Sequence, residues 1–163
     1  MTFGQSAKTS DFVADALEQW WWETAPRFPQ VKELVINADN GPETSSQRTQ
    51  FMQRLVDWAD RTGLRLHVTY YPPYHSKYNP IERCWGVLER HWNGTLLSTV
   101  DTVLEWAKTM TWKGLHPGVR LCEQVYAKGV RLGKAAKAKL EERLLRSVTL
   151  PRWDIRIEPR PVV

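Results

Sequence analysis

Residues 70–85 constrain the fold of this chain more than any other stretch, because they change structural type twice within sixteen residues. An apolar strand runs into Pro72 and Pro73, which cannot continue a central strand because proline has no amide donor. Asn79-Pro80 then supplies a preferred N-cap and a preferred first helical residue, so a helix is expected to begin there. Glu82 therefore falls in the first turn of that helix.

A second carboxylate stands at the end of another element. Asp39 closes the apolar run 34–38 and is followed by Asn40-Gly41-Pro42, which cannot extend a central strand. Two carboxylates leaving rigid elements suit Mg²⁺ or Mn²⁺, which prefer oxygen ligands, and predict metal-dependent polynucleotidyl transfer. Taken singly, the acids also fit plainer roles, Asp39 in an Asx turn and Glu82 at a helix dipole.

Together these segments resemble the catalytic domain of bacterial insertion-sequence DDE transposases, in the ribonuclease-H-like superfamily of integrases and mariner-type transposases. The resemblance runs from about residue 11 to about residue 112, and its most specific parts are 38–41 and 76–83. It implies an α/β, retroviral-integrase-like fold that binds DNA and uses Mg²⁺ or Mn²⁺. It also implies that Asp39 is the second catalytic, metal-binding acid and Glu82 the third. The 42 residues between them slightly exceed the family's commonest spacing.

The chain departs from the family pattern at its start. The family's first aspartate lies on a three-strand meander before the first helix, but here only about ten residues precede the helical segment 11–24, and none is acidic. Asp11 and Asp15 fall on that helix, too close to Asp39 to match. We therefore expect a ribonuclease-H-like fold without its first three strands, in a fragment, a split gene product or a remnant.

Two functions from different classes follow. The first is a transposase fragment that cuts and joins DNA when another chain segment supplies the missing acid. The alternative is a catalytically inactive, truncated transposase that acts as a DNA-binding or interaction protein. A general ribonuclease H or Holliday-junction nuclease fits less well, because Asn79-Pro80-Ile81-Glu82 resembles transposases.

Hydrophobic periodicity predicts alternating helices and strands in a domain spanning residues 1–112, followed by a basic C-terminal extension at 113–163. The run Leu34-Val35-Ile36 indicates a parallel strand buried on both faces. Ser10 is expected to cap the first helix, and Gly63 to end the second. The expected elements are helices at 11–25, 46–62, 81–92, 99–110 and 134–147, strands at 31–38, 64–70 and 119–126, and an arm at 153–163.

Positive charge is concentrated in the last third of the chain. Residues 1–112 hold 11 Lys and Arg against 13 Asp and Glu, whereas residues 113–163 hold 12 against 5. The extension could neutralise DNA phosphates, or it could simply be a solvated helical face. The residues assigned to DNA contact are Lys128, Arg131, Lys134 and Lys137, in a stripe that continues to Lys139, Arg143 and Arg146.

Lys77 precedes Glu82 on a loop that lies beside the cleaved DNA strand in the family. It could contact a phosphate there, or belong to a mobile surface loop.

The remaining features bear on partners and location. Trp20-Trp21-Trp22 cannot all face a core, since consecutive helical residues are 100° apart, so an exposed tryptophan and a homodimer are expected. Cys84 and Cys122 lack metal-ligand spacing and are expected to be reduced. No apolar run suits a membrane span, and no glycine-rich phosphate loop occurs, so we expect a cytoplasmic protein without a small-molecule cofactor.

Overall fold

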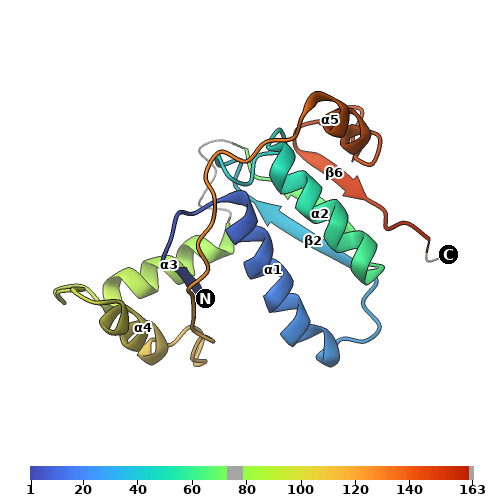
Figure 1. Ribbon diagram of the computed structural model, residues 1–163. Coiled ribbons are helices and arrows are strands. Elements are labelled where there is room, and N and C mark those ends of the chain that lie inside the picture. Colours follow the sequence, from blue (N-terminus) through green and yellow to red (C-terminus); the bar gives the residue numbers. More distant parts are fainter. Residues whose placement is uncertain (73–78, 162–163) are drawn as a thin grey trace. The chain divides into compact units, whose positions relative to one another are not determined.

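The computed structural model describes residues 1–72 and 79–161 (Figure 1). The chain forms two compact units, each described by itself. The sheet unit comprises Ala7–Pro73 and Tyr126–Val163, and the helical unit comprises Met1–Ser6 and Tyr74–Val125. The two units divide the chain at other positions than the predicted boundary between residues 112 and 113. That boundary stays a prediction. The predicted α/β class is confirmed, with helices and a mixed sheet.

The sheet unit contains a four-stranded sheet in the order β2-β3-β6-β5. Strands β2 and β3 are parallel, whereas β6 runs antiparallel to both of its neighbours, β3 and β5. Its strands are β2 (Glu33–Ala38), β3 (Arg65–Tyr70), β5 (Leu145–Arg146) and β6 (Asp154–Ile157). Its helices are α1 (Ser10–Thr24), the 3₁₀ turn η1 (Ala25–Arg27), α2 (Thr49–Thr62) and α5 (Lys134–Glu141).

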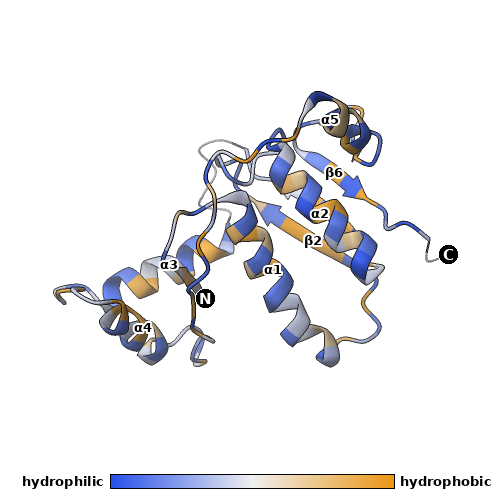
Figure 2. Cartoon of the chain, in the orientation of Figure 1, coloured by the Kyte–Doolittle hydropathy of each residue, from blue (hydrophilic) through white to orange (hydrophobic). Residues whose placement is uncertain are grey.

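One face of this sheet carries the main core. Figure 1 shows α2 between α1 and α5, and in Figure 2 α2 combines hydrophobic and hydrophilic stripes. The inward residues of β3 and β6 pack against α2, and each fully buried aliphatic side chain stabilises the fold by about 1.5–3 kcal/mol. The apolar side of α2 is buried in this core. The core includes Phe51, Leu55, Trp58, Ala59, Leu66, Val68, Ile155 and Ile157.

The other sheet face is polar, and this corrects the prediction for β2. Val35 is 58% exposed, so the strand is not buried on both faces. In the described residues β2 pairs only with β3 and forms an edge of its sheet. On β3 the burial alternates, since Leu66 and Val68 are buried while Arg65 is exposed.

The C-terminal section of the chain (residues 126–163) contributes β5 and β6 to the sheet, although its tail was expected to be an arm. Ile155 and Ile157 are fully buried, and β6 pairs with β3 from Leu66 to Thr69. Alternation of apolar and polar residues in Asp154–Ile157 suits a half-buried strand, which explains the pairing. The predicted helix at 134–147 likewise ends early, because Leu145–Arg146 pairs with β6.

Two helix starts differ from the prediction. Thr9 rather than Ser10 caps α1, accepting a hydrogen bond from the Phe12 amide at 3.2 Å, while Ser10 donates to the Glu43 carbonyl at 2.8 Å. Helix α2 begins at Thr49 instead of residue 46. Gly63 ends α2 with φ of 70°, as predicted.

The helical unit consists of α3 (Pro80–His91), α4 (Val100–Thr109) and two short strands, β1 (Thr2–Gly4) and β4 (Arg120–Cys122), which pair in parallel. Thr99 caps α4, with its hydroxyl accepting from the Thr102 amide at 3.1 Å. The small core of this unit contains Cys84, Leu88, Ala107 and Met110. Within the described residues, no helix combines the length and hydrophobicity needed to cross a membrane.

Ion pairs join the helices of the sheet unit. Arg54 on α2 pairs with Asp11, Asp15 and Glu18 on α1. Burial opposes the charge on Arg54, but the hydrogen bonds that Arg54 donates to these carboxylates outweigh it and raise the Arg54 pKa. Asp11 and Asp15 therefore fasten α1 to α2.

A second ion pair links α2 to the C-terminal section. Arg143 donates two hydrogen bonds to Asp60, at 2.9 and 2.7 Å, and the Arg160 amide donates to the same carboxylate at 2.9 Å. These hydrogen bonds, led by that from Arg143, hold the Asp60 pKa below its ordinary value of 3.8 despite partial burial.

Asp60→Asn is expected to lower the free energy of unfolding at neutral pH by about 1–2 kcal/mol, because it removes a charge-assisted bidentate pair that is partly solvent-screened. A carboxylate with a depressed folded pKa stabilises above its unfolded pKa and loses that effect as pH falls through the folded value. Urea unfolding should therefore show a gap between native and variant that closes below the ordinary pKa of 3.8. Asp57→Asn is the control, because the native Asp57 carboxylate accepts a hydrogen bond from the Gln53 side-chain amide. Equal losses of stability in both variants would contradict the assignment.

Candidate active site

Asp39 directly follows β2, at the carboxyl end of the parallel pair, where Ala38 lies opposite Tyr70. Its side chain is exposed, and Oδ1 accepts a hydrogen bond from the Thr44 hydroxyl at 3.2 Å. The same hydroxyl donates to the Asp39 carbonyl at 3.1 Å, so Thr44 holds both the backbone and the carboxylate.

Gly41 lets the chain turn back beside this carboxylate. A Cβ atom at position 41 would lie 3.3 Å from Oδ1 and 3.4 Å from Oδ2 of Asp39, closer than most real Cβ contacts. With a side chain at this position, the carboxylate would have to shift by a few tenths of an ångström. The loop is fixed further along by the Asn40 side chain, whose oxygen accepts from the Ser46 amide at 3.4 Å.

Two residues from other strands of the sheet, β3 and β5, hold this loop in place. Tyr70, buried at the end of β3, donates its hydroxyl proton to the Thr44 carbonyl at 2.7 Å. Burial raises the pKa of Tyr70, and the negative charge of Asp39 adds to the rise while Arg146 opposes it, so the phenol stays a neutral donor. Arg146 on β5 donates to the Ser46 carbonyl at 3.1 Å. Neither supporting role was predicted, because both contacts join residues far apart in the sequence.

Glu82 lies in the first turn of α3, as predicted. The Asn79 side chain accepts from the Ile81 amide at 3.3 Å, which confirms the predicted cap. The Glu82 side chain is exposed, and its carboxylate has no hydrogen bond or ion pair within residues 1–72 and 79–161. The buried face of α3 is narrow: Cys84 and Leu88 are buried in the small core, whereas Ile81 is 46% and Trp85 41% exposed.

The two candidate acids belong to different units, Asp39 to the sheet unit and Glu82 to the helical unit. In the part of the chain that the structure describes, no three His, Cys, Asp or Glu residues gather as a metal site. Asp11 and Asp15 are engaged by Arg54 and supply no further acid. Lys77 lies outside the described residues.

The predicted basic stripe divides into paired and unpaired residues. Arg143 and Arg146 are held by Asp60 and Glu141, so they serve the fold. Four exposed residues make no ion pair with any residue in the described ranges: Lys128, Arg131, Lys134 and Lys137.

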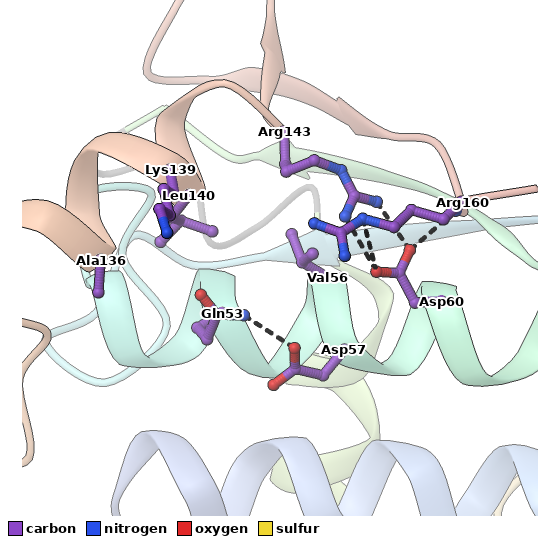
Figure 3. A pocket seen from close by; sticks show the side chains of 9 residues that line it. All are labelled: Gln53, Val56, Asp57, Asp60, Ala136, Lys139, Leu140, Arg143 and Arg160. Atoms are coloured by element: carbon purple, nitrogen blue, oxygen red, sulfur yellow. Dashed lines mark hydrogen bonds and ion pairs between the residues drawn. The ribbon is translucent and has the colours of Figure 1, made fainter.

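A pocket of about 240 Å³ lies between α2 and α5 (Figure 3). Asp60 and the Arg143 and Arg160 side chains converge at one end of it, and Lys139 lines the opposite part. Because the charged groups at that end already pair with one another, the pocket belongs to the network that fastens the C-terminal section to α2.

Comparison with known proteins identifies the chain. Residues 1–159 match the family described as Rhodopirellula transposase DDE domain. Neither curated proteins nor solved structures gave a match. The family match confirms the resemblance drawn from residues 38–41 and 76–83, and it extends through the basic C-terminal section. The chain belongs to the transposase DDE domain family.

Proposed function

We propose that this chain is the catalytic part of a transposase that cleaves and joins DNA strands with Mg²⁺ or Mn²⁺, using Asp39 and Glu82 as metal-binding acids. The observation that carries the proposal is the position of Asp39, an exposed carboxylate at the carboxyl end of a parallel strand pair, in a chain of the DDE family. Strand ends of this kind commonly form the binding edge of α/β sheets.

The chemistry of each acid supports metal binding. Within the described residues, the Asp39 carboxylate accepts one hydrogen bond, from Thr44 to Oδ1, which leaves Oδ2 available for a hard cation. The Glu82 carboxylate is exposed and unpaired there, so both of its oxygens remain available. A divalent cation would supply Lewis-acid stabilisation of the phosphoryl oxygens. Thr44 and Gly41 keep the Asp39 carboxylate oriented.

DNA as the partner is supported by the family and by the unpaired basic residues of the C-terminal section. We assign phosphate contacts to Lys128, Arg131, Lys134 and Lys137, and to Lys77 from the sequence. A DNA substrate agrees with the cytoplasmic location expected from the sequence.

Asp39→Asn and Glu82→Gln should each abolish or strongly weaken Mn²⁺ binding measured by calorimetry, because each replaces a charged ligand with a neutral amide. The same two substitutions should also abolish nicking of supercoiled DNA, scored in the same samples. Glu89→Gln, an exposed acid further along α3, should bind Mn²⁺ like the native chain. Native binding that survives both substitutions would refute the metal assignment, and binding without nicking would refute catalysis by this chain alone.

Gly41→Ala tests the support of Asp39 without removing a ligand. The added methyl group should displace the carboxylate and weaken Mn²⁺ binding by about tenfold, the lower end of the usual effect of changing a residue that orients a ligand. Gly86→Ala in α3, where a Cβ meets nothing within 4 Å, should leave binding unchanged. Equal affinities of Gly41→Ala and the native chain would show that Asp39 does not bind the ion in this geometry.

Replacing Lys128, Arg131, Lys134 and Lys137 together by Gln should weaken duplex binding and flatten its salt dependence. Each lost phosphate contact reduces the slope of log K against log salt by about 0.9, so four contacts change it by roughly 3.6. Fluorescence anisotropy at several salt concentrations measures this slope. Lys8→Gln together with Arg152→Gln is the charge control; a similar change in that variant would mean that net charge, and not this surface, governs binding.

A further inference from the structure

Thr44 is fixed at three of its groups within the loop that follows β2. Its amide donates to the Gly41 carbonyl at 3.2 Å, which closes the turn after Asp39. Its carbonyl accepts from the Tyr70 hydroxyl at 2.7 Å. Its own hydroxyl donates to the Asp39 carbonyl at 3.1 Å and to Oδ1 of the Asp39 carboxylate at 3.2 Å. The Thr44 hydroxyl is therefore kept at one place beside the carboxylate.

Tyr70 is the buried end of these contacts, and we call the hydrogen bonds that join Tyr70, Thr44 and Asp39 the Asp39 anchor. The Tyr70 side chain is 6% exposed and packs in the main core. Its backbone is held as well, because its amide donates to the Trp153 carbonyl at 2.9 Å. A phenylalanine would fill the same space in the core. What the hydroxyl adds is the hydrogen bond to the Thr44 carbonyl.

The two oxygens of the Asp39 carboxylate are not equivalent. Oδ1 accepts the hydrogen bond from Thr44, whereas Oδ2 has no hydrogen bond or ion pair with any residue in the ranges 1–72 and 79–161. Gly41, which lies close to both oxygens, has no side chain to cover either of them. The anchor therefore engages one oxygen and leaves the other open to a ligand.

This inequality matters for the choice of cation. Mg²⁺ requires octahedral geometry and usually binds one or two carboxylates, whereas Ca²⁺ accepts about six to eight oxygens and often takes both oxygens of one carboxylate. Mn²⁺ shares the octahedral oxygen coordination of Mg²⁺. A Ca²⁺ ion that bound both oxygens of Asp39 would compete with the Thr44 hydroxyl for Oδ1. A smaller ion that binds Oδ2 alone meets no such competition.

We propose that the Asp39 anchor makes Asp39 a one-oxygen metal ligand, so that the site prefers Mg²⁺ or Mn²⁺ to Ca²⁺. The inference rests on the proposed function, in which Asp39 binds the ion. Thr44 and Tyr70 act through Asp39 and are positioning residues: Thr44 holds the carboxylate, and Tyr70 holds Thr44. An anchor that only stiffened the loop would weaken the binding of every cation alike when it was removed. The ratio of the affinities for Ca²⁺ and Mn²⁺ separates these two roles.

Thr44→Val tests the inference most directly, because it removes the hydroxyl and keeps a β-branched side chain. Calorimetry with each ion should show Mn²⁺ affinity reduced by about tenfold, the lower end of the usual effect of losing a group that orients a ligand. Ca²⁺ affinity should not fall, since Oδ1 becomes free, and the ratio should shift toward Ca²⁺. Thr44→Ser, which retains a hydroxyl, should keep the native ratio. Equal losses for both ions in Thr44→Val would overturn the proposal.

Tyr70→Phe tests the buried end of the anchor. It should shift the ratio in the same direction, and Tyr70→Phe combined with Thr44→Val should shift it no further than Thr44→Val alone, because the two residues act in series. Tyr126→Phe is the matched control: this tyrosine is 7% exposed, and its hydroxyl donates to Asp15 at 2.8 Å. A shift as large in Tyr126→Phe as in Tyr70→Phe would contradict a role for the anchor.

A measurement without metal separates this inference from the proposed function. The Ser45 amide donates to the Gly41 carbonyl at 2.8 Å, so its hydrogen exchange reports whether the turn is closed. Tyr70→Phe should speed this exchange and Tyr126→Phe should not; unchanged exchange in Tyr70→Phe would overturn the anchor.

Asp39→Asn then distinguishes the two failures in the ion titrations. Mn²⁺ binding that survives Asp39→Asn would refute the proposed function itself. Mn²⁺ binding that needs Asp39, with a native ion ratio in both Thr44→Val and Tyr70→Phe, would overturn this inference alone.

Discussion

The hydrogen bonding of β3 on both sides is the constraint on which the sheet unit depends. β3 pairs with β2 in parallel and with β6 in the antiparallel sense, so it fixes the register of a strand on each side. Leu66 and Val68 then face α2, and Tyr70 reaches the loop that holds Asp39. A slip of one residue would turn all three side chains to the polar face. Core packing and the orientation of the candidate acid therefore share one register.

Charge has two separate uses in this chain. Three arginines donate hydrogen bonds to carboxylates and backbone carbonyls within the sheet unit, and they stabilise helix packing and the loop after β2. They are Arg54, Arg143 and Arg146. The exposed residues of the stripe around α5, Lys134 and Lys137 among them, lack such partners in the described residues. A sequence count of +7 over residues 113–163 overstates the charge available to DNA, because part of it is neutralised by ion pairs.

Local patterns in the sequence were sufficient for most helices, for β3 and for the Asn79 cap, because periodicity, proline and glycine act over a few residues. They failed for Val35 and for β6, whose burial depends on which strand or layer lies alongside. The same limit applies to the site. Asp39 and Glu82 could be selected from their local motifs, whereas Tyr70 could not, since its contact with Thr44 spans 26 residues.

The C-terminal section supports the Asp39 loop as well as carrying basic residues. The Tyr70 amide donates to the Trp153 carbonyl at 2.9 Å, just before β6, and Arg146 reaches the Ser46 carbonyl from β5. Removing this section would take away a neighbour of β3 and one of the donors to the loop. This agrees with a family match that continues to residue 159 instead of ending near residue 112. The basic surface and the support of the candidate acid are consequently parts of one folded unit.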